Sequence, residues 1–89
     1  MIITVDVSMC PLDSDYKPPI KNFIRRLRKY TDLQLVTNQL STQICGEFSD
    51  VTSALNSCMQ ETMREEGRVV FVTRYLNAGL DIASTPHID

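Results

Sequence analysis

The stretch that decides the fold is Ile3-Thr4-Val5-Asp6-Val7-Ser8-Met9-Cys10, with apolar side chains at the odd positions and small or polar ones at the even positions. Successive side chains of a β-strand point to opposite faces of its sheet. The stretch therefore predicts a strand with one face in a hydrophobic core and the other face open. Hydroxyl, carboxyl and thiol groups on the open face are suited to contact a small polar ligand or a second sheet.

Five further elements follow this strand. A helix is predicted over Pro19–Tyr30, because apolar residues recur at helical spacing (Ile20, Phe23, Ile24, Leu27) and its outer face is basic. Strands are predicted over residues 33–38 and 42–48, joined by a turn at 39–41. A second helix should be capped by Ser49 or Asp50 and end at Gly67. The last strand is predicted over Arg68–Leu76.

The order of these elements is β-α-β-β-α-β, the split βαβ arrangement of ferredoxin-like α+β folds. In such a fold, a four-stranded antiparallel sheet has the strand order 4-1-3-2 and both helices cover one face. We predict a ferredoxin-like ligand-binding domain over residues 1–76 and a C-terminal tail over residues 77–89. Because the helices cover one face only, the even residues of the first strand lie on the uncovered face.

Composition restricts the class of protein. The chain has 89 residues, enough for one domain, and its net charge of −2 argues against a nucleic-acid or anionic-membrane partner. It has no apolar run long enough to span a membrane and no export signal, so a cytoplasmic location is expected. Cys10, Cys45 and Cys58 have no metal-binding or redox spacing and are expected to be reduced thiols.

Two short motifs resemble those of a known family. Val7-Ser8-Met9-Cys10-Pro11-Leu12 is similar to its pattern S-x-x-P-L, and Ser41-Thr42-Gln43-Ile44-Cys45-Gly46-Glu47 to its pattern G-T-x-I-E-G-E/D. On these residues the chain resembles the YkoF-like group of thiamine- or hydroxymethylpyrimidine-binding proteins, in its short single-repeat form. The chain departs from the second pattern at Ser41, where glycine is usual, and at Cys45, where glutamate is usual.

The resemblance implies a binding protein without catalytic activity. Its expected ligand is thiamine or the hydroxymethylpyrimidine part of thiamine, held non-covalently, with no metal and no other cofactor. The resemblance also implies a homo-oligomer, a dimer or tetramer, in which the open face of one sheet packs against that of another subunit.

The expected ligand site lies at one end of the sheet. Antiparallel pairing places the end of the first strand beside the start of the third, so Ser8 should lie near Thr42 and Gln43, with Asn38 one strand further. Hydroxyl and amide groups match the amino group and ring nitrogens of an aminopyrimidine. Asp6 would offset the positive charge of a thiazolium ring. We therefore predict that Ser8, Thr42, Asn38, Gln43 and Asp6 bind the ligand.

Several of these residues also have simpler interpretations. If Ile44 faces the core, Thr42 does too, unless a bulge near Ser41 turns it outward. Asn38 is typical of turns, and Asp6 is suited to an ion pair. Tyr16 and Tyr75 are further candidates, for cation–π contact with a thiazolium. The basic face of the first helix is interpreted as a solvated surface.

Other functional classes fit the sequence less well. An enzyme is not expected, because the single histidine, His87, lies in the tail and there is no phosphate-binding glycine loop or Cys/His pair. An RNA-binding module would need aromatic residues on the two central strands. Two alternatives remain. One is a regulatory amino-acid-binding domain of the ACT type, which would favour glycine between Pro11 and Pro18. The other is a purely structural oligomer.

Overall fold

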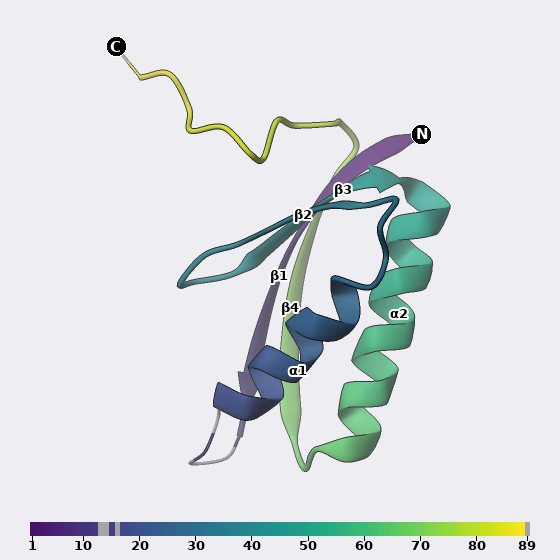
Figure 1. Ribbon diagram of the computed structural model, residues 1–89, viewed down its shortest axis with the longest axis vertical. Coiled ribbons are helices and arrows are strands. Elements are labelled where there is room, and N and C mark those ends of the chain that lie inside the picture. The colour runs from purple at the N-terminus through teal and green to yellow at the C-terminus, as the bar shows by residue number, and fades with distance from the viewer. Residues whose placement is uncertain (13–14, 16, 89) are drawn as a thin grey trace.

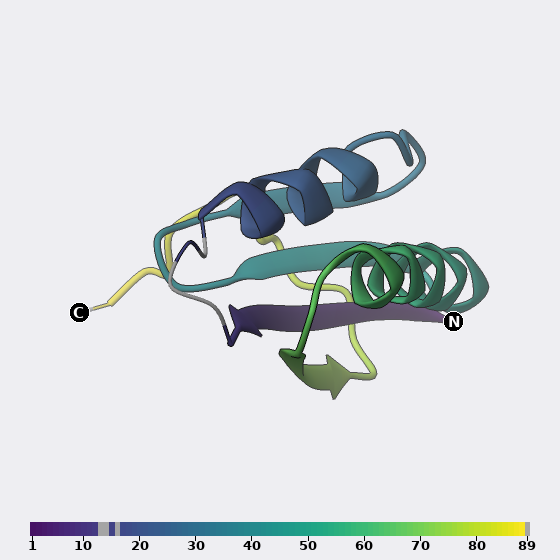
Figure 2. The same ribbon diagram turned by 90° about the horizontal axis from the view of Figure 1, so that it is seen from below.

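The computed structural model describes residues 1–12, 15 and 17–88. Its elements are β1 (Ile2–Pro11), α1 (Lys17–Leu27), β2 (Gln34–Thr37), β3 (Thr42–Glu47), α2 (Phe48–Glu65) and β4 (Val69–Leu76). All strand pairs are antiparallel, and the sheet order is β2-β3-β1-β4. Both helices pack on one face of this sheet (Figures 1 and 2). The predicted ferredoxin-like α+β fold and its strand order are confirmed.

The hydrophobic core lies between the helices and the sheet. Ile3, Val5 and Val7 of β1 are buried as their alternation predicts, and they pack against the inner faces of both helices. The remaining buried apolar residues are Phe23, Leu27, Leu33, Ile44, Val51, Ala54, Leu55 and Cys58. In the helices and residues that the structure describes, no segment is both long and hydrophobic enough for a membrane span.

The bounds of α1 differ from those predicted. The helix begins at Lys17, before Pro18 and Pro19, and ends at Leu27 instead of Tyr30. Beyond Leu27 the backbone changes to tighter hydrogen bonds, from Lys29 N–H to Arg26 C=O and from Tyr30 N–H to Leu27 C=O. Such 3₁₀-type bonds commonly close the last turn of a helix.

The predicted N-cap of α2 is wrong, whereas Gly67 stands directly after the C-cap Glu66, where the helix was predicted to end. Ser49 and Asp50 lie inside the helix, because β3 continues directly into α2 and Glu47 takes the N-cap position without a side-chain cap bond. The N–H of Phe48 instead donates to the carbonyl of Met1, 2.8 Å away. Gly67 does follow the helix, but none of the described glycines has a positive φ, so the helix ends without a left-handed residue.

The segment after the last strand lies partly on the helix-free face of the sheet. β4 ends at Leu76, and the structure contains neither helix nor strand in residues 77–88. Thr4 holds the start of this tail on the helix-free face: its hydroxyl donates to the carbonyl of Ala78 at 2.8 Å and accepts from the N–H of Leu80 at 3.0 Å. Thr4 is consequently buried, although it lies on the face without helices.

Truncation of the core is expected to be costly, and truncation of the hairpin tip is not. Leu55 is fully buried between α2 and the sheet, so Leu55→Ala should lower the free energy of unfolding by about 2–5 kcal/mol. Leu40 is 86% exposed, so Leu40→Ala should change it by no more than about 0.5 kcal/mol. Urea denaturation followed by circular dichroism measures both. Equal effects of the two substitutions would contradict this core.

Candidate functional site

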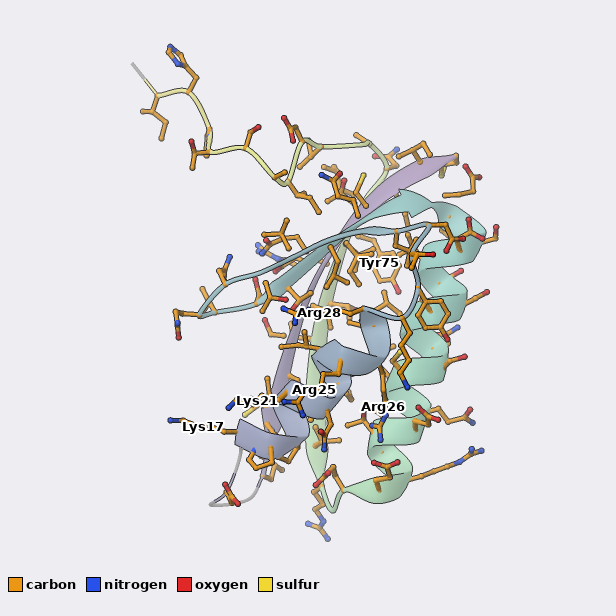
Figure 3. The ribbon with its side chains drawn as sticks, viewed as in Figure 1. Lys17, Lys21, Arg25, Arg26, Arg28 and Tyr75 are labelled. Atoms are coloured by element: carbon orange, nitrogen blue, oxygen red, sulfur yellow. The ribbon has the colours of Figure 1, made fainter. Side chains whose placement is uncertain are left out.

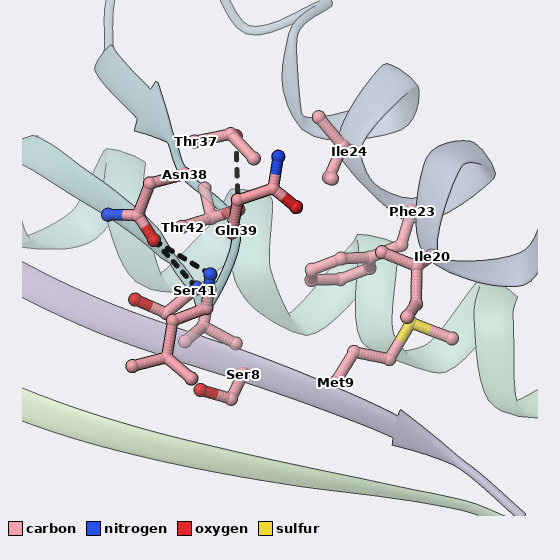
Figure 4. A pocket seen from close by; sticks show the side chains of 12 residues that line it. Ser8, Met9, Ile20, Phe23, Ile24, Thr37, Asn38, Gln39, Ser41 and Thr42 are labelled. Atoms are coloured by element: carbon pink, nitrogen blue, oxygen red, sulfur yellow. Dashed lines mark hydrogen bonds between the residues drawn. The ribbon is translucent and has the colours of Figure 1, made fainter. Parts of the chain in front are cut away.

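A cavity of about 160 Å³ lies between α1 and the β2–β3 hairpin (Figure 4). Residues of β1 form its base, one face of α1 forms one wall, and the hairpin loop forms the other. The lining residues are Val7, Ser8, Met9, Ile20, Phe23, Ile24, Thr37, Asn38, Gln39, Leu40, Ser41 and Thr42.

The cavity exists because β3 separates from β1 before β1 ends. β1 pairs with β3 only from Ile2 to Val7, but it pairs with β4 as far as Pro11. On the β3 side, residues 8–10 therefore have no strand partner within the described chain. Backbone N–H and C=O groups on an unpaired strand edge need another hydrogen-bonding partner, either water or a ligand. One side of the cavity therefore presents backbone donors and acceptors.

Helix α1 supplies the apolar wall. Phe23 and Leu27 are buried in the core, whereas Ile20 and Ile24 of the same predicted stripe are only half-buried. The Phe23 ring packs against Phe71 with ring centroids 5.0 Å apart. Ile20 and Ile24 point towards the cavity in Figure 4. The apolar face of α1 is therefore wider than the core, and its excess borders the cavity.

The hairpin supplies the polar wall. The hydroxyls of Thr37 and Thr42 are hydrogen-bonded at 3.1 Å, and Thr42 is buried. The side-chain oxygen of Asn38 accepts from the backbone N–H groups of Leu40 at 2.9 Å and Ser41 at 3.0 Å. Asn38 thus shapes the loop through its side chain, as its turn interpretation predicts. Figure 4 shows the side-chain amide of Gln39 directed towards α1.

A second cluster of polar side chains lies around Asp6 on the opposite, helix-free face of the sheet. The Asp6 carboxylate accepts from the Ser41 hydroxyl at 2.6 Å, from the Gln43 amide at 3.2 Å and from the Arg74 guanidinium at 2.9 Å. The Ser41 bond, followed by the Arg74 and Gln43 side chains, holds the pKa of Asp6 below its usual value against the opposing effect of burial. The carboxylate is charge-paired within the chain.

The structure therefore divides the predicted ligand site in two. Ser8, Asn38 and Thr42 line the cavity, whereas Asp6 and Gln43 belong to the network on the other face. The division follows from the register, which pairs Asp6 with Gln43 and Val7 with Thr42. Thr42 shares the helix-facing side with Ile44, as alternation along β3 requires, and its hydroxyl reaches the cavity margin from that side.

Of the two aromatic candidates, the structure describes only Tyr75. Tyr75 pairs with Val5 across the β1–β4 ladder and is not among the described residues that line the cavity. Tyr16 lies outside the described residues. Gln39, which sequence reasoning missed, does line the cavity, and its place at the hairpin tip was the only signal for it.

The thiols are unpaired: Cys58 is buried, Cys45 half-buried and Cys10 exposed, and burial raises the pKa of Cys58.

Loss of the Asp6 carboxylate is expected to destabilise the fold. Hydrogen bonds to charged groups contribute about 1.5–3 kcal/mol, and the side chain of Asp6 is 22% exposed. Asp6→Asn should therefore lower the free energy of unfolding by about 1–2 kcal/mol at pH 7. Arg74→Gln should cost no more than about 1 kcal/mol, because the Arg74 side chain is 80% exposed.

The effect of Asp6→Asn should depend on pH. The pKa of Asp6 is lower in the folded state than the ordinary value of 3.8, so its carboxylate stabilises the fold above that pH. The difference between wild type and Asp6→Asn should shrink as the pH falls below 3.8. Urea denaturation at a series of pH values measures the difference. A difference that stayed constant down to pH values well below 3.8 would contradict the assigned network.

Neither a family model nor a curated protein matches the sequence of this chain. Its fold does match solved structures. A hypothetical protein from Methanocaldococcus jannascii is 23% identical, with a TM-score of 0.76 over 86% of this chain and 80% of the other. A provisionally assigned thiamine biosynthesis/salvage protein from Thermotoga maritima is 16% identical, with a TM-score of 0.82 over 92% and 91%.

A third structure, a domain of unknown function of the DUF77 class from Bacillus cereus, is 13% identical, with a TM-score of 0.74 over 91% of this chain and 83% of that one. The match in each case extends over most of both chains. At these identities the comparisons show a common fold, and the ligand must be argued from the residues of this chain.

Proposed function

We propose that this protein binds an aminopyrimidine, either free or as the pyrimidine part of thiamine, in the cavity between α1 and the β2–β3 hairpin. The observation that supports this most directly is the size of the cavity. An apolar cavity of about 150 Å³ holds one benzene-sized ring. The cavity here measures about 160 Å³ and so has room for one six-membered heterocycle.

The lining of the cavity suits such a ring. Ile20, Phe23 and Ile24 offer apolar surface to the faces of a planar heterocycle, which is the usual composition of a small-molecule site. The unpaired edge of β1 offers backbone donors and acceptors to the ring nitrogens and the amino group. The amide of Gln39 adds a side-chain donor and a side-chain acceptor.

Binding without turnover is part of the proposal. In the part of the chain that the structure describes, the cavity lining consists of apolar, hydroxyl and amide side chains, without a carboxylate, imidazole or thiol. General acid–base or nucleophilic chemistry usually requires one of these groups. The thiamine-related name of the Thermotoga maritima neighbour supports the same ligand class.

The lining of the cavity also argues against the alternative of a regulatory amino-acid-binding domain. A domain that binds free amino acids must neutralise an ammonium and a carboxylate at one site, because unpaired charges are costly to desolvate. The described side chains that line this cavity are uncharged. An uncharged heterocycle therefore fits the cavity better than an amino acid does.

Isothermal titration calorimetry with hydroxymethylpyrimidine, thiamine and a set of amino acids tests the proposal. We expect the pyrimidine to bind with a dissociation constant between about 1 µM and 1 mM, with no change in the ligand after prolonged incubation. Ile24→Trp should fill the cavity and abolish binding without loss of thermal stability. Met63→Trp, on an exposed position of α2, is the matched control and should bind as wild type does. Binding unaffected by Ile24→Trp would exclude this cavity.

We also propose that a second copy of the chain packs on the helix-free face. Three apolar side chains of β4 lie exposed there, with Val70, Val72 and Leu76 at 45%, 58% and 42% exposure. Between them lies Arg74, which is paired with the partly exposed Asp6. A face that carries both charges side by side can pair with its own copy about a two-fold axis, so that each arginine also meets the other carboxylate.

Sedimentation velocity tests the self-association. Wild type should sediment as a dimer or tetramer at micromolar concentration, and Val72→Asp should shift it towards the monomer, because the new carboxylate would be buried at the interface. Leu40→Asp, at the exposed hairpin tip, is the matched control and should leave the assembly unchanged. A wild-type protein that remains monomeric at high concentration would refute the proposal.

A further inference from the structure

The outer end of the cavity is cationic. A wider depression of about 550 Å³ adjoins the cavity and shares four lining residues with it, Ile20, Thr37, Asn38 and Gln39. Its two other lining residues are Lys17 and Lys21, which lie one helical turn apart at the start of α1 (Figure 3). A ligand that fills the cavity and extends outward on this side meets these two ammonium groups.

The two lysines belong to a longer basic stripe. Lys17, Lys21, Arg25 and Arg28 follow each other at intervals of four, four and three residues, which places the first three on one face of α1 and Arg28 just past its end at Leu27. The ion pairs found among the described residues do not include any of these four. Among the described residues, no direct ion pair therefore holds these four side chains.

Arg26 differs from these four residues, because it forms ion pairs. It lies on the side of α1 that faces α2, where its guanidinium pairs with Glu61 at 3.1 Å and with Glu65 and also donates to the Thr62 hydroxyl at 3.1 Å. The basic residues of α1 thus divide into one that joins the two helices and a stripe that faces away from α2.

The size of the cavity and the charge of its mouth together limit the ligand. One six-membered ring occupies the cavity, so any further group of the ligand must lie outside it. We propose that this further group is a phosphate held by Lys17 and Lys21, so that the preferred ligand is a phosphorylated aminopyrimidine. This inference rests on the proposed function and specifies its substrate class.

The positive charges of Lys17 and Lys21 disfavour a thiazolium ring, which is the group attached to the pyrimidine in thiamine. A thiazolium ring is a cation, and at this mouth it would face two ammonium groups. Asp6, which the sequence suggested as its counter-ion, lies on the other face and is bonded to Arg74. Two cations, Lys17 and Lys21, thus lie near the cavity and can pair with a phosphate. The Asp6 carboxylate, which was predicted to pair with a thiazolium, is already bonded to Arg74.

The donors to the phosphate must be side chains. Pro18 and Pro19 occupy the first turn of α1 and have no N–H, so the backbone there cannot form the usual anion cradle of a helix N-terminus. Phosphate binding should consequently depend on the lysine ammonium groups and weaken with ionic strength.

Calorimetry with four probes tests this inference: hydroxymethylpyrimidine, its monophosphate, thiamine and inorganic phosphate. We expect the monophosphate to bind at least tenfold more tightly than the unphosphorylated pyrimidine at low salt, with an advantage that falls at high salt. Thiamine should bind more weakly than the monophosphate, and inorganic phosphate alone should bind weakest, because it cannot fill the cavity. Equal affinities for the pyrimidine and its monophosphate would overturn the inference while leaving the proposed function intact.

Substitution of the lysines localises the effect. Lys17→Gln with Lys21→Gln should remove the advantage of the monophosphate and leave the affinity for the unphosphorylated pyrimidine unchanged. Lys29→Gln is the matched control, because Lys29 follows the end of α1 at Leu27 and lines neither the cavity nor the adjoining depression. An equal loss in the control would overturn a local phosphate site. Absence of binding by any pyrimidine would overturn the proposed function itself, a result distinguishable from the loss of phosphate preference.

Discussion

The central strand β1 extends further than its neighbour β3, and this mismatch in length creates the cavity beside α1. β3 follows β1 only as far as Val7, whereas β4 accompanies it to Pro11. Past Val7 the sheet narrows to two strands, and α1 crosses the space that β3 has left. The cavity is the consequence, with a strand edge on one side and the surplus apolar face of a helix on the other.

The two faces of the sheet have separate polar chemistries. On the helix-free side, Asp6 gathers a hydroxyl, an amide and a guanidinium, so its bonding capacity is largely used within the chain. On the helix side, the Thr37–Thr42 pair and the loop-shaping Asn38 hold the hairpin in place beside α1. The first network stabilises the surface of the sheet, and the second defines a space. Asp6, Gln43 and Arg74 also border a shallow depression on their own face, but their polar groups are bonded to one another.

Alternation and helical spacing were sufficient to predict the fold, because each element contains a strong period: two in β1 and 3.6 in both helices. The site was harder to predict. Thr42 and Gln43 are consecutive residues of β3 and face opposite sides of the sheet, so they could share one site only if a bulge turned Thr42 outward, and β3 pairs with β1 in regular register as far as Thr42. The cavity depends on where β3 leaves β1, and this is a property of the paired strands that neither shows alone. The N-cap of α2 was mispredicted because β3 continues directly into the helix, so that Glu47 takes the N-cap position and the N–H of Phe48 donates to the carbonyl of Met1.

Thr4 has a consequence for any molecule that approaches the open face. Its hydroxyl engages Ala78 and Leu80 together, and the segment after β4 therefore lies across the sheet at the end where β1 begins. A facing sheet that slid along β1 in that direction would collide with this segment before full overlap. The tail therefore covers the helix-free face near the start of β1. The other half of β1, around Ser8 and the neighbouring Val72 of β4, is the part of this face that the tail leaves accessible to another surface.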